Sequence, residues 1–243
     1  MPLTPYQQVQ QVRDHYNAIG QHFSETRKKR MWAEILPFTK FVKPGMKVLD
    51  VGCGNGRLIP EFSGKKISYL GIDFSETLIE QAKERFPKRR FLLRDITTLQ
   101  GWSHIGEYDA LFCLGVLHHV PDRNRQHTVL QQMYQHTKPG GFVVISVWNL
   151  WQTRFWSNHV KQLHKKIDYG NLSYVWVPYS VSNGTKNTKT VNRFCKAYLP
   201  GELIGLVKQV GYQVDTFYFA SKGETHLSIF NGQNFCLLAR KKV

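Results

Sequence analysis

The sequence predicts a doubly wound α/β domain with a parallel central sheet, and three observations support this fold class. From residue 47 onward, short apolar runs typical of buried strands alternate with amphipathic helical stretches. The first run ends in the glycine-rich segment DVGCGNG at residues 50–56, and the second ends in an acidic residue, Asp73. Ligands of such sheets bind at the carboxyl ends of the strands, so the glycines and the carboxylate predict one shared site.

The elements follow in a regular order. Residues 1–46 are expected to form a helical cap, because residues 5–19 and 32–41 have amphipathic helical spacing before the turn at residues 43–45. The binding core is predicted at residues 47–148. Its strands are expected at 47–52, 68–73, 91–96, 108–117 and 140–149, and its helices at 57–62, 76–86 and 125–136, with Ser75 as the N-cap of the second helix.

The alternation of predicted strands and helices is interrupted after residue 148 and then resumes. Residues 149–197 are rich in aromatic side chains and contain the polar tract SNGTKNTKT at 182–190, so we expect a substrate-binding insertion with a mobile loop. Residues 198–243 predict a helix capped by Gly211 and two strands, 214–220 and 234–240, that close the sheet as an antiparallel hairpin. The whole chain is read as a single domain, residues 1–243.

Composition narrows the class of protein. No run of about eighteen apolar residues occurs, and the first residues lack the layout of a secretory signal, so we expect a soluble, cytoplasmic protein that does not enter a membrane. The four cysteines form no pair or Cys/His cluster with metal-ligand spacing; we expect reduced packing residues and no metal. They are Cys53, Cys113, Cys195 and Cys236.

The charge of the chain favours a polyanionic partner. Lys and Arg number 33 against 17 Asp and Glu, which gives a formal net charge of +16. Residues 151–243 carry 13 of the basic side chains and 4 of the acidic ones, so the excess is denser in the predicted insertion and beyond it. Nucleic acid is the partner that this balance predicts.

The glycine-rich segment and two acidic residues predict a site for an adenosine-containing ligand. Glycines let the backbone approach a ligand closely, and Asp73 can accept hydrogen bonds from both hydroxyls of a ribose. The spacing DxGxGxG differs from the GxGxxG of dinucleotide sites, which favours S-adenosylmethionine over NAD. Asp95, at the end of the third predicted strand, favours the same choice.

Residues 47–147 closely resemble the class I S-adenosylmethionine-dependent methyltransferases, including the strings LGVLHHV at 114–120 and TKPGGFVVISV at 137–147. The resemblance implies a Rossmann-like, seven-stranded sheet with an antiparallel final strand. It assigns Asp50 and the glycines to the methionine end of the cofactor, Asp73 to the ribose and Asp95 to the adenine amino group. The cofactor-binding residues it implies are Asp50, Gly52, Cys53, Gly54, Asn55, Gly56, Asp73, Phe74, Asp95, Ile96, Leu114 and Gly115.

Three further stretches resemble the wobble-uridine tRNA methyltransferases, of the yeast Trm9 type and the methyltransferase domain of the AlkB-homolog-8 proteins. They are HYNAIGQHFSETRKKRMW at 15–32, VWVPY at 175–179 and NRFCKAYLPGELIGLVKQVGY at 192–212. The resemblance implies O-methylation of the carboxylate of a 5-carboxymethyl-type wobble uridine. It also implies tRNA as partner, through its anticodon region, and a small zinc-binding activator subunit, which we expect at the sheet edge near residues 91–94.

The same resemblance makes Arg27, His119 and Arg193 the candidate catalytic residues, with the two arginines placed to hold the substrate carboxylate or a phosphate. Further side chains are candidates to contact the substrate. The substrate-binding set is Tyr16, Arg27, Trp32, His118, Trp148 and Tyr198.

Two other functions remain open at this point. A small-molecule methyltransferase of the quinone-biosynthesis kind shares the glycine-rich segment and the LHHV string, although a charge of +16 is hard to motivate for a neutral acceptor. A noncatalytic protein of this fold that binds RNA or a partner is the third possibility, and the intact Asp50 and Asp73 argue against it.

Overall fold

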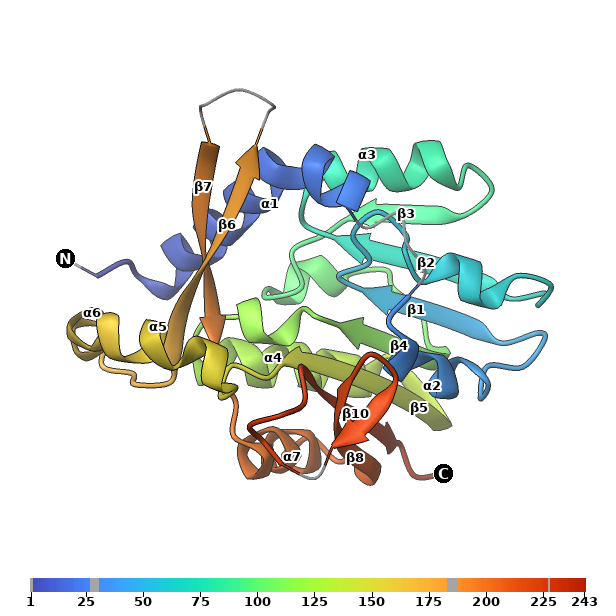
Figure 1. Cartoon of the computed structure of the whole chain (residues 1–243). Coiled ribbons are helices and arrows are strands. Elements are labelled where there is room, and N and C mark those ends of the chain that lie inside the picture. Colours follow the sequence, from blue (N-terminus) through green and yellow to red (C-terminus); the bar gives the residue numbers. More distant parts are fainter. Residues whose placement is uncertain (1, 27–30, 183–187, 227) are drawn as a thin grey trace.

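The computed structural model describes residues 2–26, 31–182, 188–226 and 228–243. Eight strands form the central sheet in the order β3-β2-β1-β4-β5-β10-β8-β9, and a separate two-stranded sheet pairs β6 with β7 (Figure 1). The strands of the central sheet are β1 Lys47–Val51, β2 Ser68–Asp73, β3 Arg90–Leu93, β4 Tyr108–Leu114, β5 Thr137–Trp148, β8 Gln213–Ser221, β9 Glu224–His226 and β10 Asn234–Arg240.

The direction of the strands confirms the predicted fold class. Strands β1 to β5 pair in parallel, and β10 runs antiparallel to both of its neighbours, β5 and β8. The antiparallel final strand is therefore confirmed, and β1 to β5, β8 and β10 make up the predicted seven-stranded sheet. The eighth, β9, is a three-residue extension at the edge beyond β8 that the sequence analysis did not anticipate.

Helices cover both faces of the sheet, because alternate strand residues point to opposite sides. In β1, Leu49 and Val51 belong to one hydrophobic cluster, which includes side chains of α4 and α7, whereas Val48 belongs to a second cluster, with side chains of α2 and α3. The helices are α1 Pro5–Thr26, α2 Leu36–Thr39, α3 Glu76–Arg85, α4 Arg123–Gln135, α5 Trp156–Lys161, α6 Leu163–Asp168 and α7 Pro200–Gln209.

Local sequence signals explain where α3 begins and why a second predicted helix is shorter than expected. Ser75 is the N-cap of α3, as predicted, since its hydroxyl accepts a hydrogen bond of 3.3 Å from the backbone N–H of Leu78. The helix predicted at residues 57–62 is wrong in type: the chain forms only a short 3-10 turn, Ile59–Phe62. Positive φ angles at Gly56 and Gly64 break the helical backbone on both sides, which leaves room for little more than one turn.

Helix α1 and the hairpin of β6 Tyr174–Ser182 and β7 Thr188–Lys196 pack together as a cap. Tyr16 and Ile19 of α1 share a hydrophobic cluster with Trp176 and Phe194 of the hairpin. The polar tract predicted as a mobile loop is partly strand, because residues 182 and 188–190 belong to β6 and β7; residues 183–187 lie outside the described residues. The predicted insertion thus contains α5, α6 and a two-stranded sheet.

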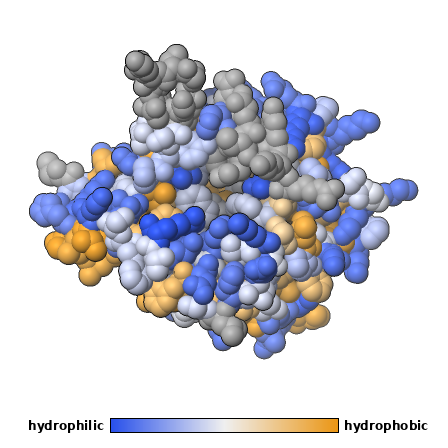
Figure 2. All heavy atoms as spheres, viewed as in Figure 1, coloured by the Kyte–Doolittle hydropathy of each residue, from blue (hydrophilic) through white to orange (hydrophobic). Residues whose placement is uncertain are grey.

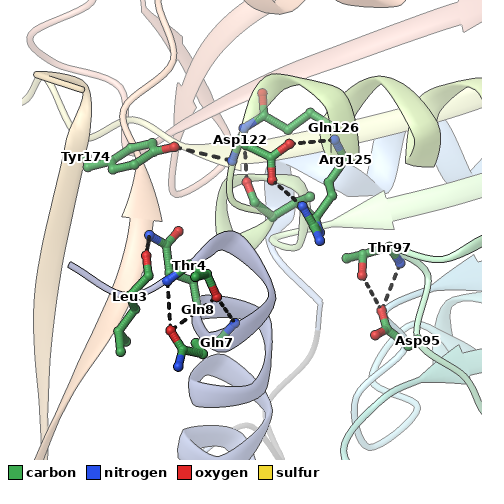
Figure 3. Close-up of polar contacts among 11 residues, drawn as sticks. Leu3, Thr4, Gln7, Gln8, Asp95, Thr97, Asp122, Arg125, Gln126 and Tyr174 are labelled. Atoms are coloured by element: carbon green, nitrogen blue, oxygen red, sulfur yellow. Dashed lines mark hydrogen bonds and ion pairs between the residues drawn. The ribbon is translucent and has the colours of Figure 1, made fainter. Parts of the chain in front are cut away.

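Hydrogen bonds anchor this cap to the core (Figure 3). The hydroxyl of Tyr174, at the start of β6, accepts a bond of 3.3 Å from the backbone N–H of Asp122. Asp122 in turn caps α4, because its Oδ1 accepts a bond of 3.0 Å from the backbone N–H of Arg125. The hairpin is therefore held against the loop that follows β4.

All four cysteines are buried and none forms a disulfide, in agreement with the prediction that they are packing residues. In the ranges that the structure describes, no helix is both long and apolar enough to span a membrane.

Candidate active site

A cavity of about 140 Å³ opens at the carboxyl ends of β1, β2, β4 and β5, and α1 closes one side of it. Its walls contain every predicted cofactor residue except Gly56. The residues that line it are Val9, Val12, Tyr16, Met31, Trp32, Asp50, Gly52, Cys53, Gly54, Asn55, Arg57, Leu58, Asp73, Phe74, Leu78, Arg94, Asp95, Ile96, Thr97, Leu114, Gly115, Val116, His119, Val120 and Trp148.

The glycine-rich loop after β1 has a conformation that requires glycine. Gly52 has a φ of +74°, and a Cβ atom there would lie 2.2 Å from Cγ2 of Val116. Gly54 has a φ of +53° and open space around it, so a ligand can approach its backbone. Gly56 also has a positive φ, +75°, but a Cβ there would meet the ring of Phe86 at 2.9 Å; this glycine shapes the turn behind the cavity.

The carboxylate of Asp73 is held in place by the backbone. Its Oδ2 accepts a hydrogen bond of 2.9 Å from the N–H of Gly54, and its Oδ1 accepts one of 2.9 Å from the N–H of Ser75. Burial raises the pKa of Asp73, and these backbone donors oppose the rise. The carboxylate lines the cavity, where its oxygens can also accept from the hydroxyls of a ribose.

Asp50, at the end of β1, is a buried acid whose described neighbours include no cation. Its Oδ2 accepts a hydrogen bond of 2.7 Å from the hydroxyl of Tyr69. Burial raises its pKa to about 7; the bond from Tyr69 lowers it, and the nearby charge of Asp73 raises it further. A cationic ligand at the methionine end, with its ammonium and sulfonium groups, would stabilise the ionised form of this acid.

Asp95, after β3, lines the cavity, and only one of its two carboxylate oxygens accepts hydrogen bonds from nearby described residues. Its Oδ1 accepts hydrogen bonds from the backbone N–H of Thr97 at 2.9 Å and from the hydroxyl of Thr97 at 2.7 Å (Figure 3). These bonds fix the orientation of the side chain. Its Oδ2 is then available to a donor such as the amino group of adenine.

On the opposite wall, Tyr16 and His119 form a buried polar pair. Nε2 of His119 lies 2.8 Å from the hydroxyl of Tyr16, and Nδ1 of His119 lies 2.7 Å from the carbonyl oxygen of Phe194. A carbonyl can only accept, so Nδ1 carries the proton and Nε2 accepts from Tyr16. Burial lowers the pKa of His119 to about 3, against the effect of the Phe194 carbonyl, and the imidazole is therefore neutral at pH 7.

Arg193, on β7, is a buried cation beside this pair. Its guanidinium carbon lies 4.7 Å from the ring centre of Trp148 and 4.7 Å from that of Tyr179. Within the described part of the chain, its Nε and Nη1 are buried without a hydrogen-bond partner. Tyr179 was not among the predicted site residues; the VWVPY stretch contains it, but the packing of a separate hairpin against the core places it here.

Some predicted substrate residues lie elsewhere. Tyr198 is fully buried in the hydrophobic cluster below the sheet, so the structure gives it a packing position instead of a place in the cavity wall. His118 is buried behind Trp148, with ring centres 4.7 Å apart. Trp32 and Trp148 do line the cavity, and the guanidinium of Arg57, which the sequence analysis missed, lies 5.1 Å from the ring of Trp32. Arg27 lies outside the described residues.

The fold also brings together a Cys/His group that sequence spacing did not reveal. His118, His119 and Cys195 are buried, and their potential ligand atoms lie within 4.8 Å of one another. Both ring nitrogens of His119 already make hydrogen bonds, to Tyr16 and to Phe194. The group is therefore explained as part of the polar network around Arg193.

Part of this chain is similar in sequence to known proteins. Residues 48–141 match the family described as a methyltransferase domain. The tRNA (carboxymethyluridine(34)-5-O)-methyltransferase of Arabidopsis thaliana is 32% identical over 145 residues, which are 60% of this chain and 34% of that protein. The Saccharomyces cerevisiae protein of the same name is 34% identical over 138 residues, which are 56% of this chain and 47% of that protein. The chain thus spans between a third and a half of the length of these curated relatives.

Solved structures agree on the fold. A SAM-dependent methyltransferase from Methanosarcina mazei superposes with a TM-score of 0.66 at 18% identity, covering 85% of this chain and 97% of that one. A Haloferax volcanii methyltransferase, in complex with the Trm112 methyltransferase activator, gives a TM-score of 0.65 at 14% identity, covering 96% and 98%. The sheet order and these neighbours agree that the chain has the fold of the class I S-adenosylmethionine-dependent methyltransferases, and residues 48–141 match a methyltransferase domain.

Proposed function

We propose that this protein transfers a methyl group from S-adenosylmethionine to the carboxylate of a 5-carboxymethyl-type uridine at the wobble position of tRNA. Arg193 carries the proposal. It is a buried guanidinium between two aromatic faces, next to the cavity wall, and no carboxylate of the described residues forms an ion pair with it. A guanidinium fork matches a carboxylate in shape and charge, so an acidic substrate completes this arrangement.

The residues that line the cavity suggest where each part of the cofactor binds. Asp50 is proposed to face the methionine moiety, Asp73 the ribose hydroxyls and Asp95 the adenine amino group. Gly52, Gly54 and the neighbouring loop residues would let the cofactor lie against the backbone. The remaining predicted contacts, from Phe74, Ile96, Leu114 and others, supply the apolar part of the same wall.

The chemistry needs little from the protein beyond alignment. S-adenosylmethionine supplies an electrophilic methyl group on a sulfonium. As the methyl–sulfur bond breaks and its electron pair stays on sulfur, a carboxylate oxygen forms the new bond to the methyl carbon, and no proton is released. A carboxylate with a pKa near 4 is ionised at pH 7 and requires no base. The neutral His119 is suited to this requirement, since it holds Tyr16 and is not available to take a proton.

The surface and the pocket suit an RNA substrate. The net charge of +16 supports contacts to phosphates, and hydrophilic side chains cover much of the face seen in Figure 2. Trp32 and Trp148 line the cavity and are candidates to stack on an uridine that has left the anticodon loop. Arg27 stays a proposed contact to the carboxylate or to a phosphate.

We also propose an activator subunit and a cytoplasmic location. The Haloferax volcanii neighbour is in a complex with the Trm112 methyltransferase activator. In this chain the edge strand β3 has Leu93 47% exposed, and its outer backbone groups face no further strand of the sheet, so a small partner could pair there. Four free, buried cysteines are compatible with a reducing compartment.

The decisive experiment measures labelled methyl transfer from S-adenosylmethionine to tRNA that lacks the final esterification, with and without the activator of the same source. The nucleosides are then analysed by mass and treated with mild base. We expect label in a base-labile uridine ester, and none with an Asp73→Ala variant. Absence of label in tRNA in the presence of the activator, from protein that binds the cofactor, would contradict the proposal and favour a small-molecule acceptor.

A further inference from the structure

We infer that Arg193 selects the acid over its own ester product by charge, and that Tyr16 and His119 are the positioning residues that prepare it for this task. The inference rests on the proposed function, because it concerns the same carboxylate. It adds a property that the methyl-transfer reaction does not require. The cation has no ion-pair partner in the described residues, so it binds the acidic reactant more tightly than the neutral product.

A directional chain of hydrogen bonds leads to Arg193. The carbonyl of Phe194 accepts from Nδ1–H of His119, and Nε2 of His119 accepts from the hydroxyl of Tyr16. Tyr16 has therefore used its only proton, so its oxygen can act solely as acceptor in the hydrogen bond that it shares with Arg193. The neutral tautomer of His119 thus fixes which way the Tyr16 hydroxyl points, and that direction anchors one edge of the guanidinium.

The guanidinium also has two nitrogens without a hydrogen-bond partner in the described part of the chain. Nε and Nη1 of Arg193 are buried without hydrogen bonds. The N–H groups of these two nitrogens point in different directions, and each of them can donate to a carboxylate oxygen. Trp148 and Tyr179 cover the guanidinium on their ring faces, which keeps water away from it.

Among the described residues no ion pair joins Arg193 to a carboxylate, although Asp14 and Asp73 are near enough to raise the pKa of His15 and of Tyr16, respectively. The groups whose pKa the charge of Arg193 shifts include His15, Tyr16, His118, His119 and Cys195. Burial lowers the pKa of the three histidines and raises that of Tyr16 and Cys195, so all five are neutral near pH 7. A buried cation of this kind is costly until an anion pairs with it.

Methyl transfer removes the anion. The substrate enters as a carboxylate and leaves as a neutral ester, while the cofactor changes from a sulfonium to a thioether. Arg193 then faces a weaker acceptor that offers no charge. Charge-assisted hydrogen bonds are roughly twice as strong as neutral ones, so we expect the ester to bind about 10- to 100-fold more weakly than the acid. The same charge thereby binds the substrate and assists product release.

The test measures binding without turnover. Anticodon stem-loops that carry 5-carboxymethyluridine, its methyl ester or 5-carbamoylmethyluridine are titrated against the protein with S-adenosylhomocysteine present. The amide is nearly isosteric with the acid and neutral, so it separates charge from shape. We expect the wild-type protein to bind the acid at least about tenfold more tightly than both neutral forms.

Variants assign this preference to Arg193. Arg193→Met should bind all three stem-loops alike, Arg193→Lys should keep part of the preference, and Tyr16→Phe should reduce it without abolishing it. Arg123→Met removes an exposed charge on α4 and should keep the full preference. The affinity of each variant for S-adenosylhomocysteine and its thermal midpoint identify any variant that has failed to fold.

Equal binding of acid and amide by the wild-type protein would overturn the inference, whether or not methyl transfer is observed. Acid-selective binding that survives undiminished in a folded Arg193→Met variant would overturn the role of Arg193. Acid-selective binding without any methyl transfer would leave the inference standing and contradict the proposed function alone.

Discussion

The hydroxyl of Tyr16, on α1, lies 2.8 Å from Nε2 of His119, in the loop that follows β4. Both side chains are buried, and their rings meet edge to face at 5.3 Å between centres. The bond joins the N-terminal cap to the sheet at the cavity wall. It also determines the protonation of the histidine, since the second ring nitrogen donates to a backbone carbonyl.

Replacing Tyr16 by phenylalanine should destabilise the protein. The variant leaves Nε2 of His119 buried without a donor, and an unsatisfied buried acceptor costs about 1–3 kcal/mol in the free energy of unfolding. Urea denaturation followed by circular dichroism measures the change. Tyr6→Phe is the matched control, because Tyr6 lies on the same helix with 62% of its side chain exposed and should change stability little. Equal effects of the two variants would contradict the importance of the Tyr16–His119 bond.

Asp50 should make cofactor binding depend on pH. Its pKa is raised to about 7 in the folded protein without ligand, whereas an ordinary Asp titrates near 4. Because the folded state holds the proton more tightly, the contribution of Asp50 to stability is present at low pH. This contribution is lost as the pH rises from about 4 through about 7. A cationic ligand prefers the ionised acid, so cofactor affinity should rise over the upper part of that range, with release of a proton on binding.

Calorimetry in two buffers of different ionisation enthalpy measures this proton release. Asp50→Asn should abolish the pH dependence and weaken binding about tenfold or more, since it removes a buried charge partner of the ligand. Asp168→Asn changes an acid on α6 that is half exposed and should leave both quantities unchanged. A wild-type affinity that stays flat between pH 5.5 and 8, a range of about two and a half units around the expected pKa, would contradict the assignment of Asp50.

Gly52→Ala should be far more damaging than Gly45→Ala. Both glycines have a positive φ, +74° and +86°, so alanine pays the cost of the left-handed backbone at either position, about 1–2 kcal/mol. Only at Gly52 does the new Cβ collide, 2.2 Å from Cγ2 of Val116, whereas nothing lies within 4 Å at Gly45. We expect Gly52→Ala to lose a further 1–3 kcal/mol or so, together with cofactor affinity. Thermal unfolding and S-adenosylhomocysteine titration of the two variants check this, and similar losses would show that backbone strain alone decides the outcome.

The cofactor wall was largely predictable from sequence because its residues lie where strands end. Asp50, Asp73 and Asp95 each follow a short apolar run, and the carboxyl ends of parallel strands meet at one edge of a sheet. The surroundings of Arg193, which we propose to bind the substrate, were not predictable in the same way. Arg193 and Tyr179 lie on a separate hairpin, and their contact with Trp148 depends on how that hairpin packs against the core.

The structure differs from the predictions for Tyr198 and for residues 57–62, and the reasons are side-chain packing and backbone conformation. Tyr198 lies next to a conspicuous aromatic and basic stretch, but its side chain turns into the core cluster under the sheet. The helix predicted at residues 57–62 relied on apolar spacing, and the glycines on both sides with positive φ limit it to a 3-10 turn. Periodicity reports which residues are apolar, whereas backbone conformation decides how far a helix can extend.

Arg193→Met should make the protein more stable and less active at the same time. The wild-type guanidinium is buried with two unpartnered nitrogens and no ion pair to a described acid, a state that costs free energy until a substrate arrives. Methionine has a similar length and packs well between aromatic rings, so we expect the free energy of unfolding to rise by about 1 kcal/mol, in line with buried charges replaced by apolar side chains. Methyl transfer to the acid should fall at least about tenfold, because the charge-assisted bonds are lost. Unfolding in urea without ligand measures the first effect and labelled methyl transfer the second. A variant that is both less stable and fully active would mean that Arg193 serves packing and not the substrate.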